Sequence, residues 1–145
     1  MPEKETLKRA EEDKKEGKAA STQAGEFVRE EIEHVREGKH GARSTKQAIA
    51  IGLAKARRAG VKLAVPKKGS KKTRKQAARD LKKGKKKGAK KSAKRSRATS
   101  RALKRESHSA ASKRALSRQA RGAARKRSAA SRSRSAKKAA RTRKK

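Results

Sequence analysis

The chain has 145 residues, room for at most one ordinary domain, and 43% of them are charged, with a formal net charge of +37. Phe27 is the only aromatic residue and cysteine is absent, so base-stacking platforms, disulfides and zinc–cysteine sites are not expected. No apolar run reaches the length of a signal peptide or a membrane span.

Charge is divided unequally along the chain. Residues 1–37 hold 11 of the 13 acids and 8 of the 50 bases, so their net charge is −3. Residues 38–145 hold 42 bases and two acids, Asp80 and Glu106, so their net charge is +40. This separation predicts that the C-terminal part binds a polyanion, and DNA and RNA are the most abundant polyanions inside cells.

The first predicted element is a short polar helix over residues 2–16. Pro2 suits a first helical position, and Gly17 suits a helix end. Only Leu7 offers a side chain to bury. Residues 18–25 (KAASTQAG) are expected to form a linker.

A second, amphipathic helix is predicted over residues 26–37. Its apolar residues form one stripe with an aromatic ring at the edge: Val28, Ile32, Val35 and Phe27. The opposite face is acidic and consists of Glu30, Glu33 and Glu37. We expect this face to be solvated, the alternative being that it docks the basic tail or a basic partner.

A third helix is predicted over residues 45–59. Ser44 and Gln47 have the spacing of a capping box, and Gly60 is the expected stop. Its stripe combines two large apolar residues with small ones that let another helix approach closely: Ile49, Leu53, Ala48, Gly52 and Ala56.

Residues 61–65 alternate apolar and other side chains before Pro66, which is typical of a short edge strand or of an extended cover over the helices. Residues 25–66 would then form a small helical module. Its predicted core consists of Phe27, Val28, Ile32, Val35, Ile49 and Leu53. A unit of about forty residues has a marginal core, so we expect it to gain stability as a homodimer or with a protein partner.

From Lys67 onward the chain is low in complexity, with 35 bases, two acids and mostly Ala, Ser and Gly between them. The composition predicts a disordered tail, with stretches 70–83 and 100–127 turning helical once phosphates neutralise their charge. The expected fold class is therefore mostly α plus disorder: a helical hairpin (26–37 and 45–59) followed by a long basic tail.

The basic tail carries the residues expected to bind nucleic acid through phosphate neutralisation, without reading sequence. They are Lys82, Lys83, Lys85, Lys86, Lys87, Lys90, Lys91, Arg95, Arg97, Arg101, Arg105, Arg114, Arg118, Arg121, Arg125, Arg127, Arg132, Arg134, Arg141 and Arg143. DNA is the first choice and RNA the second. A membrane surface is not expected, because an amphipathic membrane helix needs more large apolar residues than this tail has.

Three other kinds of site were weighed. Glu31 and His34 have the spacing of half a carboxylate-bridged metal site, but the sequence holds no second copy of this pair, so a solvated helix face is favoured. His40 is expected in the turn between the two helices. No metal or cofactor is therefore predicted. No nucleophile–base pair or phosphate-cradling loop can be assembled, so catalysis is not expected. A helix-turn-helix that reads DNA with residues 45–59 is disfavoured by its long connection and its Ala-rich start.

The block GEFVREEIEHVREGKHGARSTKQAIAIGLAKARRAGVKL, residues 25–63, resembles the signature of a family of small uncharacterised bacterial proteins, and the likeness extends to the opening and loosely to the tail. The resemblance implies a bacterial origin and no particular activity. The lack of a signal-peptide or membrane-spanning run predicts a cytoplasmic, nucleoid-associated location. The tail separately resembles the C-terminal arms of bacterial histone-H1-like proteins, which implies a nucleoid-associated role by composition. The alternative is a protein-interaction module, in plasmid maintenance or stress, that its tail anchors to the nucleoid or to ribosomal RNA.

Overall fold

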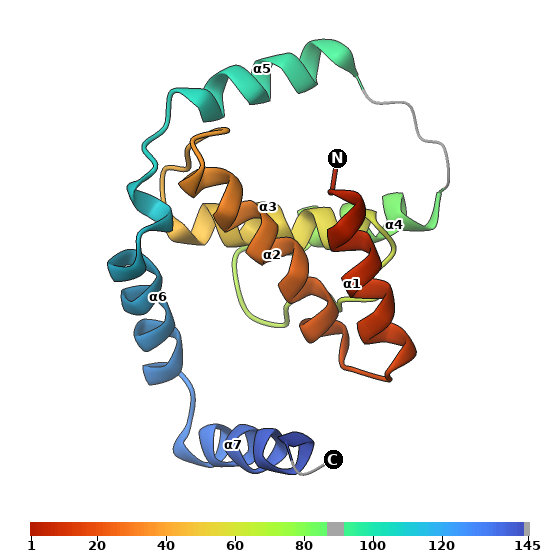
Figure 1. Cartoon of the computed structure of the whole chain (residues 1–145), viewed down its shortest axis with the longest axis vertical. Coiled ribbons are helices and arrows are strands. Elements are labelled where there is room, and N and C mark those ends of the chain that lie inside the picture. The colour runs from red at the N-terminus through yellow and green to blue at the C-terminus, as the bar shows by residue number, and fades with distance from the viewer. Residues whose placement is uncertain (87–91, 144–145) are drawn as a thin grey trace.

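The computed structural model describes residues 1–86 and 92–143, and within them the regular structure is helical. The elements are α1 (Lys4–Lys15), α2 (Ala20–Arg36), α3 (Thr45–Arg58), α4 (Lys71–Lys85), α5 (Ala93–Lys104), the 3-10 turn η1 (Ser109–Ala111), α6 (Lys113–Arg125) and α7 (Ala129–Arg143). Helices α1 to α4 pack together, and α5, α6 and α7 extend around them as an arc (Figure 1). No described helix combines the length and apolarity needed to cross a membrane.

Helix α1 ends as predicted, with Gly17 at a φ of +70°. The prediction that Leu7 is its buried residue is wrong, because that side chain is 41% exposed. The helix buries Thr6, Ala10 and Asp13 instead.

The predicted linker before the second helix is also wrong, because α2 begins at Ala20. Ala24, one turn before Phe27, is fully buried in a cluster that also holds Ala10, Ala56 and Val61. Burial against α1 and α3 therefore continues the helix toward its N-terminus. Phe27 itself is 1% exposed and lies inside this cluster, not at the edge of a stripe.

The α2–α3 pair forms as predicted, and small residues bring the two helices together. A Cβ atom added to Gly52 would lie 2.6 Å from the Cα of Val28, so the backbones touch at this point. Ile32 and Val35 are buried with Ala48 in a second apolar cluster, against which Val28 packs. Of the remaining predicted core residues, Leu53 packs partly buried on the Phe27 cluster, and Ile49 is partly exposed.

The segment after α3 is an extended cover and not a strand. Val61 is buried in the Phe27 cluster, and Leu63 packs against it. Arg57, itself 8% exposed, donates hydrogen bonds from its guanidinium to the carbonyl oxygens of Leu63 and Ala64 at 3.3 Å each. These bonds satisfy two carbonyl oxygens that the N–H groups of a neighbouring strand would otherwise have to satisfy.

The predicted long disordered tail is wrong, because the described basic part of the chain is helical, and α4, η1 and α6 pack on the α2–α3 pair. Helix α4 buries Ala77 and Asp80, and a Cβ atom at Gly84 would lie 2.1 Å from the carbonyl oxygen of Arg57. Ala110 and Ala111 of η1 are buried in the cluster of Ile32 and Val35. Small side chains allow this close contact, so burial is achieved without the large apolar residues whose scarcity suggested disorder.

Serine residues begin the helices of this basic part. Ser70, Ser92 and Ser112 each accept a hydrogen bond from the backbone N–H three residues later, and Ser128 does the same for Ser131. Each such cap stabilises a helix start by about 1 kcal/mol. Alanine, arginine and lysine then favour continuation of the helix. Helices α5 and α7 bury no residue, so local preferences are the main support of their helical form.

Candidate nucleic-acid interface

The structure distributes the predicted nucleic-acid-binding residues over four helices and leaves every described one exposed. Lys82, Lys83, Lys85 and Lys86 lie at the end of α4, and Arg95, Arg97, Arg101 and Arg105 lie on or just after α5. The remaining arginines lie on or beside α6 and α7: Arg114, Arg118, Arg121, Arg125, Arg127, Arg132, Arg134, Arg141 and Arg143. Lys87, Lys90 and Lys91 lie outside the described residues.

Helix α6 presents the most regular part of this surface. Its four arginines, Arg114, Arg118, Arg121 and Arg125, recur at helical spacing and so share one face. With a rise of about 1.5 Å per residue, the row extends over about 16 Å. Leu116, on the other side of the helix, packs against the cluster of Ile32 and Val35. Core packing therefore directs the arginine row outward.

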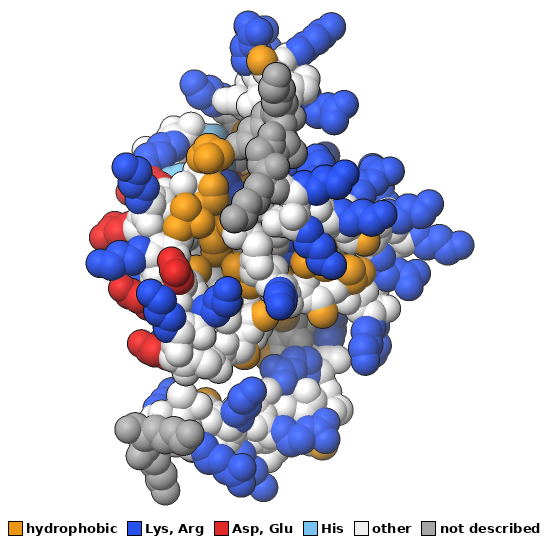
Figure 2. Space-filling model, turned by 90° about the vertical axis from the view of Figure 1, so that its right-hand side faces the viewer, with side chains coloured by type: hydrophobic (Ala, Val, Ile, Leu, Met, Phe, Trp, Pro, Cys, Tyr) orange, Lys and Arg blue, Asp and Glu red, His pale blue; other side chains and the backbone are white. Residues whose placement is uncertain are grey.

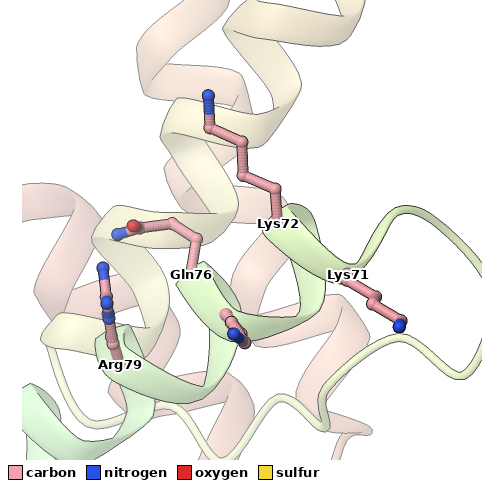
Figure 3. A pocket seen from close by; sticks show the side chains of 5 residues that line it. Lys71, Lys72, Gln76 and Arg79 are labelled. Carbon is pink, nitrogen blue, oxygen red and sulfur yellow. The ribbon is translucent and has the colours of Figure 1, made fainter.

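Helix α4 carries a second basic row, which the sequence analysis did not single out. Lys71, Lys72, Lys75 and Arg79 line a shallow hollow together with Gln76 (Figure 3). Lys71 and Lys72 extend from it in different directions, so the hollow is an open surface and not an enclosed ligand pocket. The spacing of Lys72, Lys75 and Arg79 on the face opposite the buried Ala77 and Asp80 was the signal available in the sequence.

A further hollow joins the start of α3 to α6. Arg43, Lys46 and Arg118 lie around it, beside the N-terminal turn of α3 that Ser44 caps. The capping interaction is the predicted one at 3.2 Å, but Gln47 reaches back to the N–H of Arg43 and not to that of Ser44. Arg43 and Lys46 are therefore neighbours of Arg118 on one positive surface, although about 70 positions separate them in the sequence.

Acids do not neutralise this surface. Of the two acids after residue 37, Asp80 is 1% exposed and pairs with Arg58 of α3 at 2.7 Å. Glu106 forms no ion pair, and within the described residues no lysine or arginine of α4 to α7 is paired with an acid. Figure 2 shows lysine and arginine spread over most of the visible face, with aspartate and glutamate gathered at one margin.

The acids of α1 and α2, by contrast, pair within their own half. Arg9 contacts Glu26 at 2.7 Å, Lys18 contacts Asp13 at 2.8 Å, and Glu33 and Glu37 pair with Arg29 and Lys39. No described contact joins these acids to bases of α4 to α7, so the docking of the tail on the acidic face is not seen.

The expectation that Glu30 is solvated is wrong, because its side chain is 2% exposed. Burial raises the pKa of Glu30, but the N–H of Glu3, the hydroxyl of Thr6 and the ammonium of Lys55 outweigh this, and the pKa lies below its ordinary value. The carboxylate thereby joins the start of α1 to α3.

Glu31 and His34 are also placed differently from the expectation of a solvated face. Glu31 is fully buried, and His34 and the loop residue His40 bring ligand atoms to within 4.8 Å of it and of each other. In the described residues this is the one group of three or more potential metal ligands. His108 is exposed at the start of η1 and is not part of it.

The helix-turn-helix alternative gains no support, because α3 is enclosed by other elements. Gly52 contacts α2, Arg57 contacts α4, and the Thr45 hydroxyl donates to the carbonyl oxygen of Ala110 at 2.6 Å. Lys46, Ala50 and Arg58 are its exposed residues, and they do not form a row of base-reading side chains.

Comparison of the sequence with protein-family models and curated proteins, and of the fold with solved structures, finds no match. The resemblances described above therefore stay predictions.

Proposed function

We propose that the protein binds nucleic acid without reading its sequence, with duplex DNA as the preferred partner. The observation that carries the proposal is the exposure of the bases on α4 to α7 without a paired acid among the described residues. Such bases keep their full charge available for phosphates. Binding then releases the counterions condensed on the nucleic acid, and this release drives association.

The arrangement of the bases favours a duplex over a single strand. The row on α6 is held straight by its helix, and arginine side chains form bidentate contacts with phosphate oxygens. Helix α4 presents its own row from the folded core, and α5 and α7, which lie on the arc around it (Figure 1), carry further exposed bases. The chain has one aromatic residue, Phe27, and it is buried, so no described surface offers stacking for unpaired bases.

Phosphate contacts position a protein but carry no sequence information. The exposed row of α6 consists of arginines, and on its other side the partly buried Leu116 packs against the cluster of Ile32 and Val35. The proposed role is therefore general DNA coverage, as expected of a nucleoid-associated protein.

The proposal is tested by competitive binding of duplex DNA and structured RNA to the full-length protein over a salt series. A variant with Arg114, Arg118, Arg121 and Arg125 all changed to glutamine is compared with one in which Lys4, Lys8, Lys14 and Lys15 of α1 are changed to glutamine. Both variants lose the same four charges, and all eight side chains are exposed. Circular dichroism confirms that both remain helical.

We expect the slope of log K against log salt to be less steep by about 3.6 in the α6 variant, because each of four lost phosphate contacts contributes about 0.9. Between about 50 and 200 mM salt, the affinity of the unmodified protein should therefore fall about 100-fold more than that of the α6 variant. The α1 variant should change the slope by much less. Equal effects of the two variants would show that net charge alone, and not the α6 surface, determines binding.

A binding component that survives high salt in both variants would favour the interaction-module alternative, because phosphate neutralisation does not survive high salt.

A further inference from the structure

A buried carboxylate and two histidines meet at the C-terminal end of α2. His34 lies on the last turns of α2, and His40 lies in the loop that leads to α3. Glu31 Oε1 is 3.3 Å from His40 Nε2, and the two imidazole rings stand edge to face with centroids 6.1 Å apart. One ligand atom from each of the three residues lies within 4.8 Å of the others.

Glu31 is short of partners for a buried carboxylate. The residue is 0% exposed, and neither carboxylate oxygen accepts a hydrogen bond of normal geometry from the described residues. The Lys55 ammonium lies 2.7 Å from Oε2, but it also lies 3.2 Å from Glu30 Oε1, so two buried carboxylates share one ammonium. A buried charge without full compensation is strongly unfavourable, and the site needs one more positive charge beside Oε1.

His40 is oriented as metal-binding histidines usually are. Its Nδ1 lies 3.0 Å from the carbonyl oxygen of Gly41, so in the neutral ring Nδ1–H donates to that oxygen and Nε2 carries a lone pair. That lone pair faces Glu31 Oε1, which is also an acceptor. Two acceptors at this distance repel each other unless a cation lies between them, and a backbone carbonyl on the other ring nitrogen is the usual second contact of a metal ligand.

We propose that Glu31, His34 and His40 bind a divalent transition metal ion, with Zn²⁺ as the best fit. Zinc bonds to nitrogen and oxygen of about 2.0–2.2 Å place tetrahedral ligand atoms about 3.4 Å apart, which is close to the separation of Glu31 Oε1 and His40 Nε2. Mixed imidazole and carboxylate donors suit zinc better than magnesium or calcium, which prefer oxygen donors alone.

A second carboxylate lies beside His34, outside the group of three ligands. Glu3 Oε1 lies 2.9 Å from His34 Nε2 and 3.2 Å from the Lys39 ammonium. A metal ion held by Glu31, His34 and His40 would join the end of α2 to the α2–α3 loop. Its role in that position is to stabilise the fold, which makes it independent of the proposed binding of nucleic acid.

The test is titration of the full-length protein with Zn²⁺ by calorimetry and with Co²⁺ by visible absorption, without nucleic acid. The chain lacks cysteine and carries a net charge of +37, so adventitious cation binding is small. His34→Gln and His40→Gln are compared with His108→Gln, a control that removes the third histidine of the chain from an exposed position.

We expect the unmodified protein to bind one Zn²⁺, to give the intense Co²⁺ spectrum of a tetrahedral site, and to unfold at a higher temperature with Zn²⁺ than with chelator. His34→Gln and His40→Gln should each weaken binding at least about tenfold, the range seen when a ligand or its support is removed. His108→Gln should bind as the unmodified protein does.

His40→Cys serves as a second variant in which binding should be retained. A thiolate at this position should coordinate Co²⁺ and add a sulfur-to-metal charge-transfer band to the spectrum. Absence of saturable Zn²⁺ binding in the unmodified protein, or an equal loss in His108→Gln, would overturn the proposal.

Discussion

The acidic and basic halves of the chain are both helical, but their side chains are stabilised in different ways. In α1 to α3 almost every acid has a basic neighbour, and Glu30, Glu31 and Asp13 are buried among such contacts. In α4 to α7 the bases face solvent, and the buried residues are Ala77, Asp80, Ala110 and Ala111. The comparison teaches that a strongly basic segment folds when a few small residues dock onto a neutralised core and the charges stay outside.

A small set of polar contacts joins the two halves. Asp80 of α4 pairs with Arg58 of α3, and η1 accepts hydrogen bonds from Arg36 and Thr45. In the same region the N–H groups of Gly41 and Ala42 donate to the carbonyl oxygens of Leu103 and Ser107. Backbone groups therefore supply much of the junction, which explains why side-chain composition did not reveal it.

The largest effect is expected from removing the aromatic core residue of the acidic half. Phe27→Ala should lower the free energy of unfolding by about 3–5 kcal/mol, because it leaves a cavity among Ala10, Ala24 and Ala56. Urea denaturation followed by circular dichroism measures the change. Leu7→Ala, at an exposed position, is the control and should stay within about 0.5 kcal/mol. If the two variants were equally stable, the apolar core would not be what supports the acidic half.

A smaller effect is expected at the junction of the halves. Asp80→Asn removes the charge that pairs with Arg58, and because Arg58 is half exposed and can turn to solvent, the loss should be about 1–2 kcal/mol. Hydrogen exchange should show faster exchange in α4 and little change in α1. Glu106→Gln is the control, because it removes the charge of the other acid in the basic half. It should leave the rate of amide exchange in α4 unchanged.

A change confined to the basic half is expected from its helix caps. Ser112→Ala removes the side chain that accepts the N–H of Ala115, and should destabilise the start of α6 by about 1 kcal/mol. Ser117→Ala, an exposed position within the same helix, should have the opposite sign, since alanine favours helix interiors. Amide exchange over residues 113–118 distinguishes the two variants, and equal rates would contradict a capping role.

The smallest change in stability is expected on acidification, and it should occur in the acidic half. The pKa of Glu30 is below its ordinary value, because the contacts with Glu3, Thr6 and Lys55 outweigh the effect of burial. The stabilisation is therefore present above the unfolded pKa, near 4.5, and is lost as pH falls through the lower folded value. Exchange at the start of α1 should accelerate below pH 4.5, and Glu30→Gln should remove most of this dependence.

Most of the acidic half was predictable from local patterns. The spacing of Val28, Ile32 and Val35, the cap at Ser44 and the glycines after each helix identified the end of α2 and both ends of α3 within one residue. The early start of α2 was not predictable from local patterns, because Ala24 is buried by contacts with distant residues. The serine caps of α4 to α7 are present in the sequence, but a composition rich in bases and poor in large apolar residues is typical of disorder.

The candidate metal ligands were also only partly predictable from local sequence patterns. Glu31 and His34 share a helix, so their spacing was visible, but His40 reaches them only because the loop after α2 turns back. Likewise, Arg43 and Arg118 are neighbours of one hollow only because η1 docks on α2 and α3.

The sequence by itself determined the separation of charge, the absence of cysteine chemistry, the α2–α3 pair, the ends of α1 and α2 and both bounds of α3. These properties depend on composition or on residues within a few positions of each other. Only the tertiary structure decided that the basic half is folded, which acids are buried and which bases share a face. Those outcomes depend on close backbone contacts at Gly41, Gly52 and Gly84, where a missing side chain, and not a recognisable one, allows distant segments to meet.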